Sequence, residues 1–440
     1  MKKQRESFKS QWGFILACIG SSVGMGNIWM FSTRVSSYGG GSFLIPYFIF
    51  VALVGFTGVI GEMSFGRATR SGPVDAFGIA CERKGKRKYG EALGMIPVLG
   101  AMAMAIGYTV VMGWILKYAV GTFTGKTLAP KGVEEFSGAF GSMASAFGNN
   151  GWQIAALILC MGILMLGVVS GIEKANKFMM PLFFGLFVIL AVYVAFQPGA
   201  AEGYKYIFRI DPKALADPVT WIFALGQAFF SLSVAGNGTL IYGSYLSDEE
   251  NIPAAAARVA FFDTLAAILA ALVIIPAMAV VLGEGINDVK GGPGLMFVYL
   301  VNVFNAMPAG RIIGAIFYIC VLFAGVSSIV NLYEAPIAFL QEHFKFKRAA
   351  AVGIIGVIGL VVSIAIQPWT SQWMDVVSIY ICPLGAALAG IMFFWVLKKE
   401  TAMDAVSEGA KKRVGDWFHT LGKFVYVPLA LLALILGAFY

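Results

Sequence analysis

Apolar segments long enough to cross a bilayer constrain this chain more than any other feature. Eleven are predicted, at 11–37, 41–66, 90–122, 152–170, 174–197, 217–245, 253–283, 310–341, 349–366, 371–397 and 424–440. With 59% hydrophobic and 13% charged residues, the chain has too little polar surface to cover a soluble globule. We therefore expect an all-α membrane protein, because a helix satisfies its own backbone hydrogen bonds in lipid.

The distribution of Lys and Arg predicts the orientation of these segments. Basic residues concentrate in the parts of the chain that fall on one side of the membrane, at 1–10, 67–88, 345–348 and 398–423. The positive-inside rule makes that side cytoplasmic, which predicts a multi-pass protein of the plasma membrane with its N-terminus inside. The net charge of +8 then reflects topology and attraction to the inner leaflet, and no nucleic-acid partner is expected.

Two glycine-containing stretches interrupt the first and sixth predicted helices, at Ser21–Asn27 and Ser231–Gly238. A break inside the membrane is tolerated only where the freed N–H and C=O groups meet protein, water, an ion or a substrate. Two breaks at corresponding places in two halves of a chain predict a transport site near the middle of the bilayer. For Gly20 and Gly24 the alternative is close helix packing, which small residues permit.

Polar side chains within the apolar segments support the same interpretation. Asp263 lies inside the seventh segment, where an unpaired acid costs about 3 kcal/mol, so it needs a partner. A bound cation is one candidate partner and Arg258 is the other, although Arg258 stands five positions away along the helix. Ser327 and Ser328 are adjacent hydroxyls in an apolar helix, but such hydroxyls also bond to their own helix.

Four motifs carry a resemblance to a known family: Gly20–Asn27 (GSSVGMGN), Gly39–Tyr47 (GGGSFLIPY), Gly226–Ser233 (GQAFFSLS) and Phe323–Ser328 (FAGVSS). With them the chain resembles the neurotransmitter:sodium symporters over essentially all eleven segments, and in particular bacterial members that carry hydrophobic amino acids. The resemblance implies discontinuous helices 1 and 6 in a five-plus-five inverted repeat. The implied organisation is a cytoplasmic N-terminal segment at 1–10, a transporter core at 11–397 with repeats at about 11–197 and 217–397, a cytoplasmic loop at 398–423 and an eleventh helix at 424–440.

The resemblance also implies three groups of site residues. The substrate would contact Ser22, Val23, Gly24, Met25, Gly26, Met104, Tyr108, Phe230, Ser231, Ser233, Gly236, Ser328 and Leu332. A first sodium ion would be held by Ser22, Asn27, Ser231 and Asp263 together with the substrate carboxylate. A second sodium ion would be held by Gly20, Val23, Ala324, Ser327 and Ser328.

Gates are implied in the same way, with one departure from the family pattern. The inner gate would use Arg5, Ser244, Tyr245 and Glu342. At the outer gate the family usually has an arginine where this chain has Met30, so Arg34, one turn further, is the candidate partner of Asp375. Gly171 and Pro181 match the family's spacing in the fifth helix, where a proline without an N–H weakens the helix.

The expected function is sodium-coupled symport of bulky hydrophobic and aromatic L-amino acids such as tryptophan, phenylalanine or leucine, by alternating access with two sodium ions. The resemblance implies that Gly236 lets the site accept side chains of different sizes, because the leucine-selective relative has a phenylalanine ring at that position. No chloride requirement is expected, since Asp263 already supplies a fixed negative charge. The alternative is a proton-coupled carrier of the same architecture with Asp263 as the titrating group. The sequence shows no nucleophile–base pair, metal-ligand spacing or filter repeat, so neither an enzyme nor a channel is expected.

Overall fold

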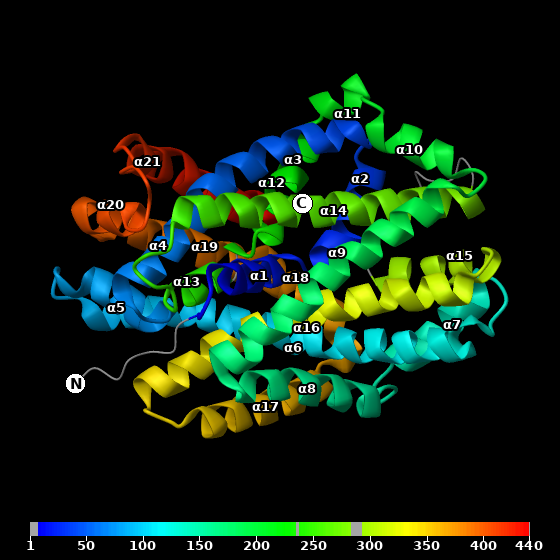
Figure 1. The fold of residues 1–440 in the computed structure, drawn as a ribbon, viewed down its shortest axis with the longest axis horizontal. Coiled ribbons are helices and arrows are strands. Elements are labelled where there is room, and N and C mark those ends of the chain that lie inside the picture. The colour runs from blue at the N-terminus through cyan, green and yellow to red at the C-terminus, as the bar shows by residue number, and fades with distance from the viewer. Residues whose placement is uncertain (1–7, 235–236, 283–292, 440) are drawn as a thin grey trace.

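The computed structural model describes residues 8–234, 237–282 and 293–439, and its regular elements in these ranges are helical. Figure 1 shows the long helices running roughly along the longest axis of the molecule, with shorter helices at both ends. The first half contains α1 (Gln11–Ser22), α2 (Phe31–Ser37), α3 (Gly41–Val54), α4 (Ile60–Thr69), α5 (Pro73–Glu82), α6 (Arg87–Thr124), α7 (Val133–Ala144), α8 (Asn150–Met165), α9 (Lys174–Ala195), α10 (Ala200–Phe208) and α11 (Pro212–Ala216). The second half contains α12 (Pro218–Ser231), α13 (Gly238–Gly243), α14 (Ile252–Leu282), α15 (Leu300–Ala306), α16 (Gly310–His343), α17 (Arg348–Ala365), α18 (Thr370–Val376), α19 (Cys382–Ile391), α20 (Lys399–Ser407), α21 (Trp417–Leu421) and α22 (Val427–Gly437).

Helices of spanning length occupy most of the predicted segments. Within the described residues, eight continuous helices are long and apolar enough to cross a membrane, and a ninth span is the bent pair Gln11–Ser22 and Gly26–Ser37. The other two predicted segments hold the shorter helix α8 and the interrupted pair α12 and α13. The all-α membrane fold is thus confirmed, while the count of eleven spans stays a prediction.

The break in the first span follows from its sequence. Ser10 caps the start of α1 by accepting a hydrogen bond from the Gly13 N–H, at 3.0 Å. The helix ends at Ser22, and Val23 is extended before a π-helical turn at Gly26–Met30 leads into α2. The two halves are bent by 58°, which exposes backbone groups at mid-span.

The sixth span is broken by residues in the left-handed conformation. Asp217 caps α12 and Pro218 occupies its first turn, so the start of this helix is well defined. After Ser231 the chain turns, with Ser233 at φ 55° and Asn237 at φ 53°. Positive φ is unfavourable for residues with a side chain, and such strain often accompanies a functional site.

Two predicted boundaries are wrong. The fourth helix ends at Met165 rather than 170, because Gly167 adopts a φ of 88° and a π-helical segment, Val168–Glu173, then leads into α9. The last helical stretch begins at Trp417 rather than 424, because Phe418 is buried and Trp417 stacks on Phe56. The segment 398–423 therefore contains α20 and the start of the final helix as well as loop.

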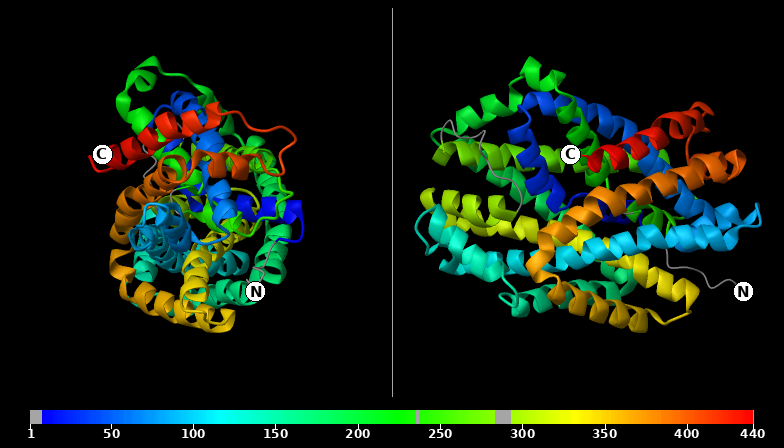
Figure 2. Two further views of the ribbon diagram at one scale, coloured as in Figure 1. Left: turned by 90° about the vertical axis from the view of Figure 1, so that its left-hand side faces the viewer. Right: turned by 180° about the vertical axis from the view of Figure 1, so that it is seen from behind.

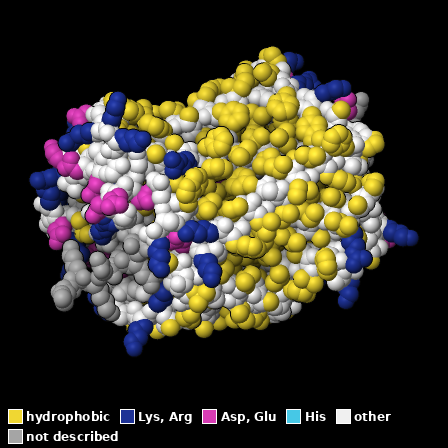
Figure 3. All heavy atoms as spheres, in the orientation of Figure 1, with side chains coloured by type: hydrophobic (Ala, Val, Ile, Leu, Met, Phe, Trp, Pro, Cys, Tyr) yellow, Lys and Arg dark blue, Asp and Glu magenta, His cyan; other side chains and the backbone are white. Residues whose placement is uncertain are grey.

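The surface of the molecule matches a membrane environment. Figure 3 shows a wide band of hydrophobic side chains across the middle, with Lys, Arg, Asp and Glu gathered toward the ends. Figure 2 shows the last helix on the outside of the bundle, in agreement with the 22% buried share of the most apolar part of Trp417–Gly437. An apolar belt of this kind is the surface that lipid tails cover.

Candidate functional site

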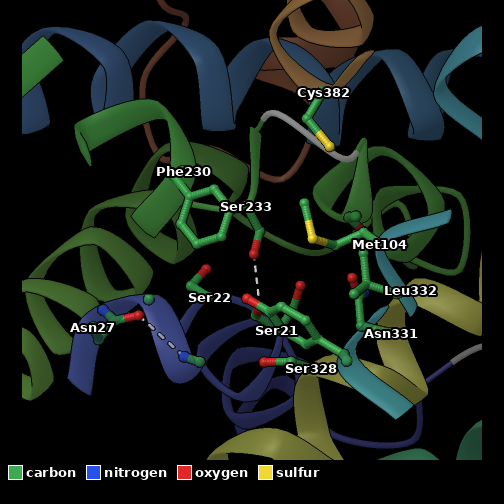
Figure 4. Close-up of a pocket in the computed structure, with 14 residues that line it drawn as sticks. Ser21, Ser22, Asn27, Met104, Phe230, Ser233, Ser328, Asn331, Leu332 and Cys382 are labelled. Carbon is green, nitrogen blue, oxygen red and sulfur yellow. Dashed lines mark hydrogen bonds between the residues drawn. The ribbon is translucent and has the colours of Figure 1, made fainter. Parts of the chain in front are cut away.

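The two helix breaks meet at one cavity in the interior. Both breaks contribute serines, and the Ser233 hydroxyl donates a hydrogen bond to the Ser21 carbonyl, at 2.6 Å, across the two interrupted helices. Figure 4 shows this bond beside Phe230, Met104 and Leu332, which come from α12, α6 and α16. The cavity is therefore lined by polar residues from the breaks and from α16 (Ser328, Asn331), and by apolar side chains from α12, α6 and α16 (Phe230, Met104, Leu332).

Close backbone approach explains several glycines at this cavity. A Cβ atom on Gly24 would lie 2.7 Å from the Ser328 hydroxyl, and one on Gly238 would lie 3.1 Å from the Ser21 hydroxyl. A Cβ on Gly26 would overlap the ring of Phe230. These glycines thus keep the space between the helices open and let the hydroxyls reach it.

Nine of the thirteen residues predicted to contact the substrate line the cavity: Ser22, Gly24, Gly26, Met104, Tyr108, Phe230, Ser233, Ser328 and Leu332. Val23, Met25 and Ser231 do not line it, because they are buried in the packing behind the breaks. Gly236 lies outside the described residues.

Five lining residues were not predicted for the substrate: Ser21, Asn27, Gly238, Asn331 and Cys382. Ser21, Asn27 and Gly238 belong to the two breaks, so their sequence context could have indicated them. Asn331 is an amide in an apolar helix, which is also a usable signal. Cys382 carries no such signal, because a thiol is common in any buried helix.

Asp263 forms the centre of a buried polar cluster beside the cavity. The Asn27 side-chain amide donates to Asp263 Oδ1 at 2.7 Å and to the Ser231 hydroxyl at 2.9 Å. The Ser231 hydroxyl donates to Asp263 Oδ2 at 2.7 Å. The partners of Asp263 in this cluster are uncharged, and Arg258 instead lies over the Trp12 ring, 5.5 Å from its centroid.

Three of the residues predicted for a second sodium ion, Gly20, Ala324 and Ser327, lie together where α1 packs against α16. The Ser327 hydroxyl donates to the Ala324 carbonyl at 3.0 Å. A Cβ on Gly20 would lie 3.0 Å from Ser327 Cβ, so the two helices touch at this glycine. The Ser22 and Ser328 hydroxyls are buried and have no hydrogen-bond partner in the described part of the chain. Such unpartnered oxygens are the kind that a hard cation binds.

A second, larger cavity adjoins the first on the side of α2 and α18. Tyr108, Phe230 and Gly26 line both cavities. Arg34 and Asp375 line the second cavity, but no ion pair joins them among the described residues. The Arg34 guanidinium instead donates to the Phe223 carbonyl at 3.3 Å and lies 4.5 Å from the Phe223 ring centroid.

At the end of the molecule where Phe8 lies, aromatic rings pack together beside a buried ion pair. Phe8 packs on Tyr245 and Tyr242, with ring centroids 6.4 and 5.7 Å apart. The Tyr245 hydroxyl donates to Glu334 Oε1 at 2.7 Å, and Arg348 pairs with both oxygens of Glu334 at 3.1 and 2.8 Å. Glu334 and Arg348 were not predicted.

The remaining residues predicted for the inner gate lie in the same region or beyond the described chain. Glu342 accepts hydrogen bonds from the Gly72 N–H at 3.1 and 3.0 Å. Ser244 is buried and donates from its hydroxyl to the Ile241 carbonyl. Arg5 lies outside the described residues.

A helical membrane protein whose two broken helices enclose a polar cavity at mid-span belongs to the class of secondary transporters. A family model described as the Sodium:neurotransmitter symporter family matches residues 5–131 and 132–439. The chain belongs to this family, and is therefore a sodium-dependent transporter rather than an enzyme.

Individual proteins resemble the chain over nearly its whole length. An uncharacterized sodium-dependent transporter from Bacillus subtilis is 30% identical over 97% of this chain and 96% of the relative, and one from Methanocaldococcus jannaschii is 29% identical over 98% and 90%. A sodium-dependent nutrient amino acid transporter from Drosophila grimshawi is 23% identical over 99% of this chain and 77% of the relative. The crystal structure of MhsT in complex with L-phenylalanine superposes with a TM-score of 0.87 and 32% identity, covering 99% of this chain and 100% of that one.

Proposed function

We propose that this protein is a sodium-coupled symporter that imports bulky hydrophobic and aromatic L-amino acids by alternating access. The observation that carries the proposal is the convergence of Asn27, Ser231 and Asp263 next to the cavity between the broken helices. These residues come from three different helices, and their oxygens are of the kind that a hard cation prefers. A sodium ion bound there would replace the hydrogen bonds that the Asn27 side-chain N–H donates. The Asn27 amide would then turn its oxygen toward the ion.

The cavity itself supports an amino-acid substrate. The breaks supply backbone N–H groups near Gly24 and Gly26 for a carboxylate and carbonyls near Ser22 and Ser231 for an ammonium group. Met104, Phe230 and Leu332 line the other side, where they would surround an apolar side chain. A charged side chain would be rejected, because burying an unpaired charge there is costly. The amino-acid transporter relative and the phenylalanine complex of MhsT agree with this substrate class.

Two sodium sites and no chloride site fit the charges of this region. The first site would use Ser22, Asn27, Ser231 and Asp263 with the substrate carboxylate, and the second would use Gly20, Val23, Ala324, Ser327 and Ser328. Asp263 places a fixed negative charge beside the first ion, so no anion is needed to offset it.

The two ends of the molecule suit alternating access. The larger cavity reaches the substrate cavity past Tyr108 and Phe230. At the other end, Phe8 packs on Tyr242 and Tyr245, and Tyr245 donates to Glu334 of the Glu334–Arg348 pair. The distribution of Lys and Arg supports a cytoplasmic N-terminal end, and with that orientation the arrangement corresponds to a carrier closed on the inside.

Uptake into proteoliposomes tests the proposal. A panel of labelled amino acids is offered with an inward sodium gradient and, in parallel, with sodium replaced by potassium. We expect accumulation of leucine, phenylalanine and tryptophan only with sodium, and no uptake of lysine or glutamate. Uptake that a proton gradient sustains without sodium would instead identify the proton-coupled carrier.

A further inference from the structure

Asn176 carries a buried oxygen that the contacts of its own helix do not use. The residue lies in the first turn of α9 and is 1% exposed. Its side-chain N–H donates to the Ile172 carbonyl at 2.9 Å, which orients the amide. The opposite atom, Oδ1, has no hydrogen-bond partner in the described part of the chain. A buried amide oxygen without a partner is unfavourable, so this one requires an explanation.

The oxygen points to the place where α1, α9 and α16 meet. A Cβ atom on Gly20 would overlap Asn176 Oδ1 and would lie 3.0 Å from both Asn176 Cγ and Ser327 Cβ. Gly20 and Ser327 are therefore the immediate neighbours of this oxygen. Both belong to the second sodium site proposed above.

An amide oxygen suits sodium, which is a hard cation that takes neutral oxygen ligands. The five residues assigned to the second site offer carbonyl and hydroxyl oxygens from α1 and α16 only. A ligand from α9 would close the third side of the ion.

We propose that Asn176 Oδ1 is a ligand of the second sodium ion, an inference that rests on the proposed function. The assignment gives the buried oxygen its partner. It also connects the ion to the π-helical segment Val168–Glu173, because the nitrogen of the same amide bonds to the Ile172 carbonyl within that segment.

The same segment is bonded to the start of α1. Glu173, its last residue, accepts hydrogen bonds from the Lys9 N–H and the Ser10 hydroxyl, at 2.8 and 3.0 Å. The amide of Asn176 is therefore held by a segment that is itself fixed to the helix carrying Gly20.

Equilibrium binding of labelled leucine to the purified full-length protein, measured against sodium concentration, tests the inference. The Asn176→Leu variant keeps the size of the side chain but removes the oxygen. We expect its half-saturating sodium concentration to rise by about five- to tenfold and its Hill coefficient to fall toward one, with leucine affinity at saturating sodium within about twofold of wild type. Asn176→Asp retains an oxygen and should keep a sodium dependence within about threefold of wild type.

Asn149→Leu is the matched control, because Asn149 is also a buried amide without a hydrogen-bond partner but lies at the start of α8, away from the cavity. It should leave the sodium dependence unchanged.

An unaltered sodium curve for Asn176→Leu would overturn the inference while leaving the proposed function intact. Absence of sodium-dependent binding in the wild type would overturn the proposed function itself. If Asn176→Leu fails to bind leucine at any sodium concentration, leucine binding by Asn176→Asp and Asn176→Ala is measured against sodium concentration instead. Equal half-saturating sodium concentrations for the two variants contradict the ligand role. A higher half-saturating concentration for Asn176→Ala alone supports it.

Discussion

At the scale of single residues, the proposed transport function depends on a few buried polar atoms. Asp263 is fully buried, and both of its oxygens accept hydrogen bonds from neighbours on other helices. Cys382 was not predicted and lines the cavity, where its sulfur points toward Met104 in Figure 4. These two residues lead to separate predictions, one for the ion and one for the substrate.

Replacing Asp263 with Asn should weaken sodium binding. The substitution keeps the shape of the side chain but removes the negative charge that faces the proposed first ion. We expect the half-saturating sodium concentration for leucine binding to rise by about tenfold or more, or the variant to acquire a chloride requirement. Glu202→Gln, at an exposed carboxylate on α10, is the control. Wild-type uptake that falls to background when gluconate replaces chloride would contradict the inference that Asp263 makes a chloride ion unnecessary.

Replacing Cys382 with Leu should reduce the space available to large substrates. Cys382 is buried and lines the cavity, so the atoms added by leucine would enter it. Overpacking of this kind costs about 1–3 kcal/mol, so tryptophan affinity should fall by at least about fivefold more than leucine affinity. Cys382→Ala should preserve both affinities better, and Cys160→Ala, outside the cavity, should change neither. Equal losses for tryptophan and leucine in Cys382→Leu, measured by competition binding, would show that Cys382 does not limit substrate size.

At the scale of helices, buried polar contacts hold the inner ends of the bundle together. Glu334 on α16 is fully buried and pairs with Arg348 at the start of α17, while Tyr245, which follows α13, donates to the same carboxylate. A buried charge that loses its partner is strongly unfavourable. The contact therefore matters more than the exposed ion pairs of the surface.

Glu334→Ala should destabilise the protein by about 3 kcal/mol, because it leaves Arg348 partly buried without its carboxylate. Thermal unfolding in detergent, followed by fluorescence-detected size exclusion, measures the change as a lower melting temperature. Glu202→Ala breaks the exposed pair with Lys205 and should cost less than about 1 kcal/mol. Similar melting temperatures for the two variants would show that the buried pair does not stabilise the closed inner end.

At the scale of the whole molecule, the proposed coupling to two sodium ions would make transport electrogenic. Two ions moved with one zwitterionic amino acid carry two charges, so a membrane potential contributes about 4.6 kcal/mol per 100 mV. This corresponds to roughly a thousandfold accumulation before the sodium gradient itself is counted.

Proteoliposomes with a potassium diffusion potential test this coupling. With equal sodium on both sides, an inside-negative potential set by valinomycin should drive leucine uptake above equilibrium. Reversal of the potential should abolish this accumulation. Uptake that does not respond to the potential would exclude net movement of positive charge with the substrate.

The sequence by itself determined the membrane class, most of the spanning segments and the position of both helix breaks. These features are local, because apolar length sets a span and glycine with small polar residues interrupts it, and lipid leaves the backbone few alternatives. Five of the nine predicted substrate contacts that line the cavity lie in or beside the breaks, whereas the other four lie in α6 and α16 and came from the family resemblance.

The tertiary structure alone decided which other residues reach the site. Cys382 and Glu334 lie in helices where apolar residues surround them, so the sequence pattern does not distinguish the face toward lipid from the face toward the interior. Asn176 stands between Lys174 and Lys177, where a polar residue carries no sign of burial. The neighbours of these three residues come from parts of the chain far away in sequence: Gly20 lies against Asn176, Met104 lines the same cavity as Cys382, and Tyr245 donates to Glu334. Such contacts depend on how the helices pack, and close approach at glycines such as Gly20 and Gly100 sets that packing.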